Sequence, residues 1–174
     1  MIVTTVTIGI VFPMREDDAA LTAWRQLLEV HQRLTTDMDA RLRSEHGLSL
    51  QWYDVLVQLT EAGGPLRMRD LADRTLFSRT ECTRIVARME TAGLVTKRPD
   101  PDDGRGVYAE LTPEGKKALR EASRTHLADI ERSFTSHLNE RESTVIADAL
   151  WRIASAARSA WRDLDEPHTT ATVR

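Results

Sequence analysis

Apolar residues recur at helical spacing over most of this chain. Residues 18 to 45 place them three and four positions apart, and residues 48 to 61 repeat the pattern after a glycine. Residues 113 to 138 and 139 to 161 show the same spacing. Such stripes are typical of amphipathic helices that bury one face. The pattern therefore predicts a mainly α-helical protein, with long helices before and after a central segment of different character.

The central segment begins with two helices in close succession. Residues 68 to 75 form the first, and Ser78 followed by Glu81 is a capping box, which predicts where the second begins. Gly93 suits the left-handed conformation that ends a helix. The apolar stripe of the second helix consists of Cys82, Ile85, Val86 and Met89. Because only two residues separate the helices, the pair is predicted to be a helix-turn-helix.

Alternation replaces helical spacing immediately afterwards. In residues 94 to 98 and 107 to 112, apolar and polar side chains alternate over two short stretches. The residues between them, 100 to 106, are rich in aspartate, glycine and proline, as is typical of a turn. The two stretches are predicted to form a β-hairpin, and a helix-turn-helix followed by a hairpin is a winged helix. The expected fold class is therefore mainly α with a small β-hairpin wing.

The face of the second helix opposite its apolar stripe carries side chains that can read DNA. At about 100° per residue, this face holds Arg79, Thr80, Thr83 and Arg84, with Arg88 at its margin. Arginine can form two hydrogen bonds to a guanine edge, and threonine offers a hydroxyl and a methyl group. On an isolated helix such a face is more often simply solvated. Within a winged helix it predicts contacts in the major groove.

Short motifs follow one another at specific spacing through this segment. They are Asp70-Leu71-Ala72, Ser78 with Thr83-Arg84, Gly93-Leu94-Val95, Asp100-Pro101-x-Asp103-x-Arg105-Gly106 and Leu111-Thr112-Pro113-Glu114-Gly115. In this order the chain resembles the MarR family of bacterial transcriptional regulators, over about residues 18 to 164. The resemblance implies a homodimeric regulator that binds a specific operator. It also implies a repressor that a small, often phenolic, ligand releases from DNA.

One domain is expected, from residue 15 to residue 165. The winged helix would occupy residues 48 to 112. Helices 18 to 46 and 113 to 164 would form a dimer interface, because they offer more apolar surface than one small winged helix covers. A two-fold dimer would place two recognition helices about one turn apart on a pseudo-palindromic operator.

The two ends of the chain differ from this domain. Residues 1 to 14 are expected to be an extension, apolar and uncharged in its first thirteen residues. It lacks the basic region of a signal peptide and is shorter than the ~20 residues of a membrane-spanning helix, so no membrane partner is expected. Two interpretations remain: an arm that packs on the body or on a partner, or a segment upstream of a true start at Met14. Residues 166 to 174 are expected to be a disordered tail.

Eight residues are predicted to contact DNA, from the second helix and from the hairpin. They are Ser78, Arg79, Thr80, Thr83, Arg84, Arg88, Arg98 and Arg105. Arg105 should enter or border the minor groove beside the hairpin tip. Asp100 or Asp103 should orient its guanidinium group in the unbound protein.

The distribution of charge supports this assignment, although the net charge does not. A formal net charge of −3 over 174 residues would by itself argue against a nucleic-acid binder. However, residues 67 to 98 hold eight basic and four acidic side chains, whereas residues 126 to 166 hold five basic and eight acidic. Such a distribution attracts phosphate only to the basic region. The expected partner is double-stranded DNA, and the expected location is the cytoplasm, in association with the nucleoid.

The sequence offers no chemistry for catalysis. It has no glycine-rich phosphate loop, no Cys/His cluster with zinc-like spacing and no nucleophile motif, so we expect no enzyme, no metal and no cofactor. The single cysteine, Cys82, lies on the apolar stripe and is predicted to be a small core residue. The alternative function is a winged helix that binds only proteins. Such a module would not need arginine and threonine concentrated on the outer face of its second helix.

A ligand site follows from the resemblance alone. The candidates to line a pocket for a small aromatic or phenolic effector are Trp24, His31, Trp52 and Asp54. Packing in the core or in the dimer interface explains the same four residues, and both interpretations stay open.

Overall fold

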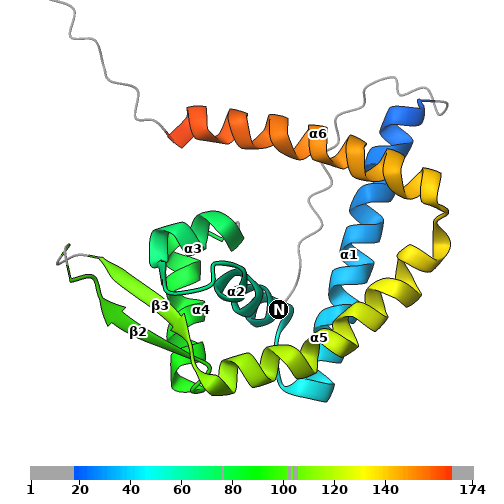
Figure 1. Ribbon diagram of the computed structural model, residues 1–174. Coiled ribbons are helices and arrows are strands. Elements are labelled where there is room, and N and C mark those ends of the chain that lie inside the picture. Colours follow the sequence, from blue (N-terminus) through cyan, green and yellow to red (C-terminus); the bar gives the residue numbers. More distant parts are fainter. Residues whose placement is uncertain (1–17, 76, 102, 104–105, 166–174) are drawn as a thin grey trace, which may run out of the picture. The chain divides into compact units, whose positions relative to one another are not determined.

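The computed structural model describes residues 18–75, 77–101, 103 and 106–165, with side chains described as far as residue 157 (Figure 1). Its elements are α1 (Ala19–His46), α2 (Leu50–Glu61), β1 (Leu66–Arg67), α3 (Met68–Thr75), α4 (Arg79–Thr91), β2 (Val95–Pro99), β3 (Val107–Leu111), α5 (Pro113–Ser133), the 3-10 turn η1 (Thr135–His137) and α6 (Glu140–Asp165). The predicted fold class, mainly α with a small wing, is confirmed. The predicted extension, residues 1 to 14, and tail, residues 166 to 174, lie outside the described residues.

Two compact units divide the chain, Met1–Ala122 and Ser123–Arg174. The first contains the winged helix, and the second contains the later part of α5, η1 and α6. Each unit is described below by itself. The single domain expected from residue 15 to residue 165 stays a prediction.

Side-chain caps fix the ends of the first two helices. The Asp18 carboxylate accepts hydrogen bonds from the backbone N–H groups of Ala20 (2.9 Å) and Leu21 (3.4 Å), which would otherwise lack partners at the start of α1. Gly47, in the left-handed conformation with φ 67°, ends α1. The Ser49 hydroxyl then caps α2, so this helix begins two residues later than the apolar pattern suggested.

The helix-turn-helix forms as predicted, from α3 and α4. The Ser78 hydroxyl accepts a hydrogen bond from the Glu81 N–H at 3.2 Å, one half of the expected capping box. Among the described contacts the other half is absent, because the Glu81 carboxylate instead accepts a hydrogen bond from the Gln51 side chain of α2 at 3.1 Å. At the other end of α4, Gly93 has φ 73° and its N–H and that of Leu94 bond back to the last turn.

The wing is the outer part of a three-stranded antiparallel sheet with strand order β1-β3-β2. The predicted hairpin is β2 and β3, paired from Val95 with Leu111 at the base to Pro99 with Val107 toward the tip. The third strand, β1, pairs Leu66 with Ala109 on the other side of β3. This strand was not predicted, because two residues cannot display an alternating pattern.

The core of the first unit lies beneath these elements. It contains the whole apolar stripe of α4, together with buried residues of α1, α2, α3, both hairpin strands and α5, among them Leu42, Val55, Leu56, Leu71, Val95 and Ala109. Cys82 is fully buried, and burial raises the pKa of its thiol to about 11. The outer face of α4 is thereby fixed by the burial of its inner face.

A close contact joins the start of α5 to the end of α4. The Thr112 hydroxyl donates to the Gly93 carbonyl at 2.7 Å and accepts from the Gly115 N–H at 2.9 Å. The Thr112 N–H also bonds to the Leu94 carbonyl at 3.2 Å. A Cβ atom at Gly115 would lie 2.1 Å from that same carbonyl oxygen. Position 115 therefore has to be glycine for the chain to turn so closely from β3 into α5.

In the second unit, α5 ends at Ser133, earlier than the predicted end near residue 138, and η1 follows. The start of α6 was predicted correctly: the Asn139 N–H bonds to the Glu142 carboxylate (2.9 Å) and the Glu142 N–H to the Asn139 side chain (3.0 Å), a complete capping box. Among the described residues this unit buries no apolar side chain fully, whereas Leu127, Val145, Trp151 and Ile153 are exposed.

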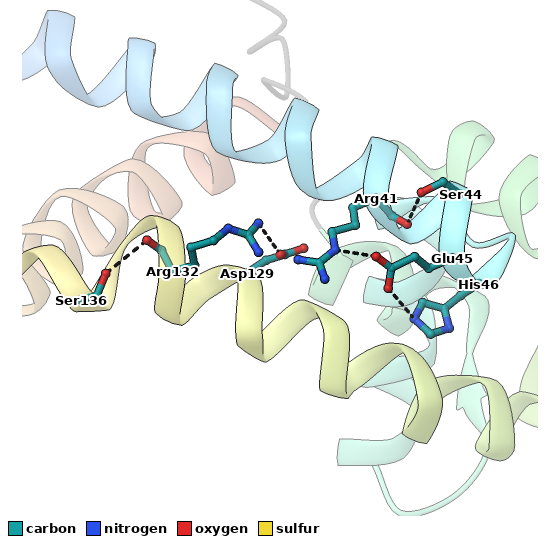
Figure 2. A network of polar contacts seen from close by, with 7 residues as sticks. All are labelled: Arg41, Ser44, Glu45, His46, Asp129, Arg132 and Ser136. Carbon is teal, nitrogen blue, oxygen red and sulfur yellow. Dashed lines mark hydrogen bonds and ion pairs between the residues drawn. The ribbon is translucent and has the colours of Figure 1, made fainter.

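Ion pairs within single helices stabilise both long segments locally (Figure 2). At the end of α1, the Arg41 guanidinium lies 2.7 Å from the Glu45 carboxylate, one turn away. On α5, Arg132 lies 2.5 Å from Asp129. Pairs at this spacing stabilise a helix by about 0.2–0.5 kcal/mol each. They strengthen the helices themselves, whereas the buried core positions α3 and α4.

Candidate nucleic-acid interface

The exposed face of α4 carries the side chains predicted to read bases. Arg79, Thr80, Thr83 and Arg84 are exposed, and Arg88 is exposed in the last turn, while the stripe on the opposite face is buried. The Thr83 hydroxyl donates to the Arg79 carbonyl at 2.9 Å and keeps its lone pairs and methyl group for a partner. The ion pairs found in the described part of the chain include none with Arg79 or Arg84. Both cations therefore face solvent with their charge uncompensated.

The wing is attached to the start of α3 by Arg67, the last residue of β1. Its guanidinium lies 2.5 Å from the Asp100 carboxylate and 3.9 Å from that of Asp103. Its Nε donates to the Tyr108 hydroxyl at 3.2 Å, and the group lies 5.7 Å from the centre of the Tyr108 ring. The hydrogen bond to Tyr108 and the neighbouring carboxylates raise the pKa of Arg67. This cation is therefore held in place on the inner side of the wing.

Two backbone hydrogen bonds close the loop at the wing tip beside Asp100. The Asp100 N–H bonds to the Gly106 carbonyl at 2.9 Å, and the Gly106 N–H bonds to the Asp103 carbonyl at 2.7 Å. A Cβ atom at Gly106 would lie 2.7 Å from the Cβ of Asp100, so only glycine fits beside this buried carboxylate. The arrangement holds the two ends of the tip together.

Arg98 lies on the outer strand of the wing. Its guanidinium is 5.1 Å from the centre of the Tyr108 ring and 3.8 Å from the Glu110 carboxylate of β3. Tyr108 thus contacts two arginines, one from each neighbouring strand. Stacking on an aromatic ring restricts an arginine without neutralising it. The Arg98 side chain is 52% exposed, so a phosphate can reach it in competition with Glu110.

A groove of about 390 Å³ lies between α4 and the wing. We call it the wing groove, and its lining residues are Arg67, Met68, Arg69, Thr83, Lys97, Asp103, Gly106 and Val107. Three of them are cations. Lys97 is also paired with Glu90 of α4 at 2.8 Å, which lowers the pKa of the Glu90 carboxyl. Arg69 lies 3.1 Å from Asp70, so all three cations are paired with carboxylates. A sugar-phosphate backbone in this groove would compete with those carboxylates for the cations.

Comparison with known proteins identifies the family. The family model named MarR family matches residues 46–106. The crystal structure of AbsC, a MarR family transcriptional regulator from Streptomyces coelicolor, superposes with a TM-score of 0.78 at 34% identity, covering 84% of this chain and 99% of that one. The chain belongs to the MarR family.

Two further relatives extend the comparison. Sco3205 from Streptomyces coelicolor, a MarR family regulator whose crystal structure is a complex with DNA, has a TM-score of 0.75 at 28% identity and covers 78% of this chain and 86% of that one. The transcriptional regulator FarR from Neisseria gonorrhoeae is 33% identical over 95 residues, which are 55% of this chain and 64% of that protein. The match thus spans less than two thirds of FarR. This protein is a MarR family transcriptional regulator.

The structure brings most of the predicted DNA-contacting residues onto two neighbouring elements of this MarR fold. Six of them lie on α4 or at its cap, and Arg98 lies on β2. Arg105 lies outside the described residues. Asp100 and Asp103 both contact Arg67, and a role of these carboxylates in orienting Arg105 stays a prediction.

Sequence analysis missed the cations of the wing groove. Arg67, Arg69 and Lys97 entered the local charge count, but none was assigned to a site. Arg67 and Lys97 are 30 residues apart and meet only because β1 and β2 both pair with β3. The one signal in the sequence is the Arg-x-Arg pattern of residues 67 to 69 at the start of the first helix.

The four predicted ligand-binding residues lie on α1 and α2 of the first unit. Trp24 and His31 are exposed on α1, with 55% of Trp24 accessible, whereas Trp52 packs partly against the core. Asp54 is half-buried, and burial raises the pKa of its carboxyl despite a hydrogen bond from Gln58 at 3.5 Å. Among the described contacts, no hydrogen bond or ion pair joins these four side chains, and their role stays a prediction.

Two general properties of the described residues complete the picture. Every helix in that part of the chain is too short or too polar to cross a lipid bilayer. No three His, Cys, Asp or Glu side chains there are grouped so that they could hold a metal ion.

Proposed function

We propose that this MarR family regulator is a homodimeric repressor that binds a pseudo-palindromic DNA operator sequence-specifically. Its α4 helix would enter the major groove, and its wing would follow the neighbouring backbone. The observation that carries the proposal is the exposed face of α4, where Arg79 and Arg84 stand without ion pairs among the described residues. Sco3205, a 28% identical relative, was crystallised with DNA.

The proposed contacts divide into two classes. Arg79, Thr80, Thr83 and Arg84 would contact base edges, where arginine and threonine discriminate between bases. Ser78, Arg88, Arg98 and Arg105 would contact phosphate or the flanking minor groove, and the wing groove adds Arg67, Arg69 and Lys97. Phosphate contacts position a protein on DNA, and base contacts specify the sequence.

Substitution on α4 tests this assignment. Arg79→Ala and Arg84→Ala should each weaken binding to the operator by about 1–3 kcal/mol, roughly tenfold to a hundredfold, with a smaller effect on unrelated DNA. Fluorescence anisotropy with DNA from upstream of the chain's own gene measures both affinities at one salt concentration. Arg141→Ala on α6, also an exposed arginine, should leave them unchanged.

Each outcome decides between the functions considered. An equal loss for every DNA sequence would reassign the two arginines to phosphate contacts. Absence of any sequence-specific binding in the unsubstituted protein would overturn the proposal and favour the alternative, a winged helix that binds only proteins.

The dimer is supported by exposed apolar side chains. Trp24 and Leu28 are about half exposed on α1, and Trp151 of α6 is 66% exposed. The second unit has no fully buried apolar residue among those described, so its helices need a partner surface. A second copy of the chain is the commonest partner of such a surface in soluble oligomers.

Sedimentation equilibrium tests the dimer directly. The full chain should sediment at twice its mass of 19.7 kDa. Trp151→Asp should shift the equilibrium toward monomer, whereas Thr144→Asp, at an exposed polar position of the same helix, should not. A monomer that binds operator as tightly as the intact protein would contradict the proposal.

Repression and ligand release complete the proposal. A dimer bound over a promoter would exclude polymerase. The two α4 helices of such a dimer would fit the operator at only one separation, and the packing of the long helices would set that separation. A ligand that favours another separation therefore lowers operator affinity. Trp24, His31, Trp52 and Asp54 are the residues proposed to contact a small aromatic effector. The proposed action on operator DNA would take place in the cytoplasm, at the nucleoid.

A further inference from the structure

One carboxylate lies on the side of α4 that is proposed to contact DNA. Glu90 belongs to the last turn of this helix. At about 100° per residue, it lies within about 40° of Arg79 and Thr83 around the helix axis. The Glu90 side chain is 40% exposed. Because phosphate repels a carboxylate, an acidic residue in this position opposes DNA binding unless a cation compensates its charge.

The compensating cation is Lys97 of β2, the strand that lies beside α4 (Figure 1). One Glu90 oxygen accepts a hydrogen bond from the Lys97 backbone N–H at 3.2 Å, and the other lies 2.8 Å from the Lys97 ammonium nitrogen. The hydrogen bond from the Lys97 side chain lowers the pKa of the Glu90 carboxyl, so this group stays ionised near neutral pH. Glu90 therefore occupies a cation of the wing groove that a phosphate could otherwise bind.

The cations proposed to read bases differ from those of the wing groove in this respect. Within the described part of the chain, no ion pair includes Arg79 or Arg84, whereas Arg67, Arg69 and Lys97 each contact a carboxylate. The charge at the base-reading positions is thus free, and the charge in the groove is already neutralised. Base contacts carry sequence information and phosphate contacts do not. The neutralised cations are therefore those whose contacts would favour every DNA sequence alike.

We propose that Glu90 is a specificity-determining residue, which lowers the affinity for unrelated DNA more than the affinity for the operator by occupying Lys97. The inference rests on the proposed function, in which α4 reads the operator. On the operator, base contacts fix the backbone in one register beside the wing groove, so a phosphate displaces Glu90 from Lys97. On other sequences no base contact holds a phosphate there, and Lys97 stays with Glu90. Specificity then comes from a group that disfavours the wrong partner.

The salt dependence of binding distinguishes the two complexes. Each DNA phosphate that a cation neutralises releases counterions and steepens the plot of log affinity against log salt concentration by about 0.9. Lys97 should contribute to this slope in the operator complex and not in the complex with unrelated DNA. Glu90→Gln frees Lys97 in both complexes. The glutamine amide oxygen can still accept the hydrogen bond from the Lys97 N–H, but it has no charge to hold the ammonium group.

Fluorescence anisotropy with the full-length protein, between about 50 and 200 mM salt, measures both slopes. Glu90→Gln should bind unrelated DNA about eightfold more tightly than the parent at about 0.1 M salt, with a slope larger by about 0.9. Its affinity for the operator should rise by a smaller factor, because only the displacement of Glu90 is saved, and its operator slope should stay that of the parent. The ratio of operator affinity to unrelated affinity should therefore fall.

Three further variants isolate the pair. Lys97→Gln should lower the operator slope by about 0.9 and leave the slope on unrelated DNA unchanged. The double variant Glu90→Gln/Lys97→Gln should bind unrelated DNA with the slope of Lys97→Gln, because Glu90 acts only through that cation. Glu121→Gln removes the same charge from an exposed position of α5 outside the wing groove and should leave both slopes unchanged.

Several outcomes would overturn the proposal. A loss of affinity for both kinds of DNA in Glu90→Gln would show that Glu90 only positions the wing. An unchanged slope on unrelated DNA in that variant, or an equal loss of slope on both DNAs in Lys97→Gln, would show that Glu90 does not occupy Lys97. If the parent shows no sequence-specific binding, the proposed function fails, whereas the slopes of Glu90→Gln and the double variant on unrelated DNA still decide whether Glu90 competes for Lys97.

Discussion

Replacing Gly115 with alanine should destabilise the folded protein although alanine is the better helix former. Gly115 lies in the first turn of α5, and its missing side chain lets the helix pass over the Leu94 carbonyl. A Cβ atom there would lie 2.1 Å from the carbonyl oxygen and 3.1 Å from its carbon. Because carbon and oxygen atoms normally approach to about 3.3 Å or more, the start of α5 has to move by about 1 Å.

The cost can be estimated from the contacts that such a movement disturbs. Forcing an extra methyl group into a packed site typically costs about 1–3 kcal/mol. The two hydrogen bonds of the Thr112 hydroxyl, at 2.7 and 2.9 Å, are worth about 1 kcal/mol each and would be weakened. Alanine offsets at most about 1 kcal/mol through its helix propensity. The net expectation is a loss of about 2–3 kcal/mol in the free energy of unfolding.

Urea denaturation at one fixed chain concentration measures this loss, since the stability of the proposed dimer would depend on concentration. The midpoint should fall with little change in slope, and the thermal midpoint should fall by about 5–10 °C for a chain of this size. Gly64→Ala is the matched control, because its new Cβ meets no atom within 4 Å. Equal stability of Gly115→Ala and the parent, or equal losses for both variants, would refute the steric argument.

Three further predictions concern the wing and the core. Arg105→Ala should weaken binding to every operator variant by a similar factor in anisotropy titrations, because a minor-groove or phosphate contact carries little sequence information; unchanged affinity would reduce the wing to a structural hairpin. Arg67→Gln should weaken binding to every operator variant by a similar factor, because it removes the cation that holds Asp100. The control variant Lys117→Gln on α5 should leave operator affinity unchanged. Cys82, whose thiol pKa is raised to about 11 by burial, should stay protonated and react with a thiol reagent at pH 8 only as fast as the protein unfolds; rapid modification of the native protein would show a reactive thiolate instead.

Helix boundaries could be predicted where the deciding contacts lie within four residues. Ser78 caps α4 and Asn139 caps α6, and Gly47 takes the left-handed conformation that ends α1. Each of these interactions joins a side chain or a glycine to the adjacent turn. Nothing distant in the chain has to be known, so the pattern of residue types was sufficient.

The end of α5 could not be predicted, because the side-chain bonds near it leave no trace in the apolar pattern. Apolar spacing continues to Leu138, but the backbone leaves the α-helical conformation at Phe134, where φ is −138°. The Thr135 hydroxyl donates to the Glu131 carboxylate, and the Ser136 hydroxyl donates to the Arg132 carbonyl. Side chains thus provide hydrogen-bond donors where the helix ends. The apolar pattern carries no record of such bonds, because a turn of 3-10 helix preserves much of the spacing.

One part of the candidate site could be predicted from the sequence and another part could not. The outer face of α4 was predicted from one helix, because its buried stripe fixes which side chains remain outside. The wing groove was not, since Arg67 reaches Asp100 only through the pairing of β1 with β3. Two-residue strands have no period of their own. Contacts that depend on such pairing are visible only once the sheet is built.

The junction of α4, β3 and α5 combines both kinds of contact. Gly93 and Leu94 follow α4, Thr112 binds both of their carbonyls, and Gly115 lets α5 approach. The stop at Gly93 could be predicted from the adjacent turn. The bond from Thr112 to Gly93 joins residues 19 positions apart, and it forms only because the pairing of β2 with β3 returns the chain to the end of α4.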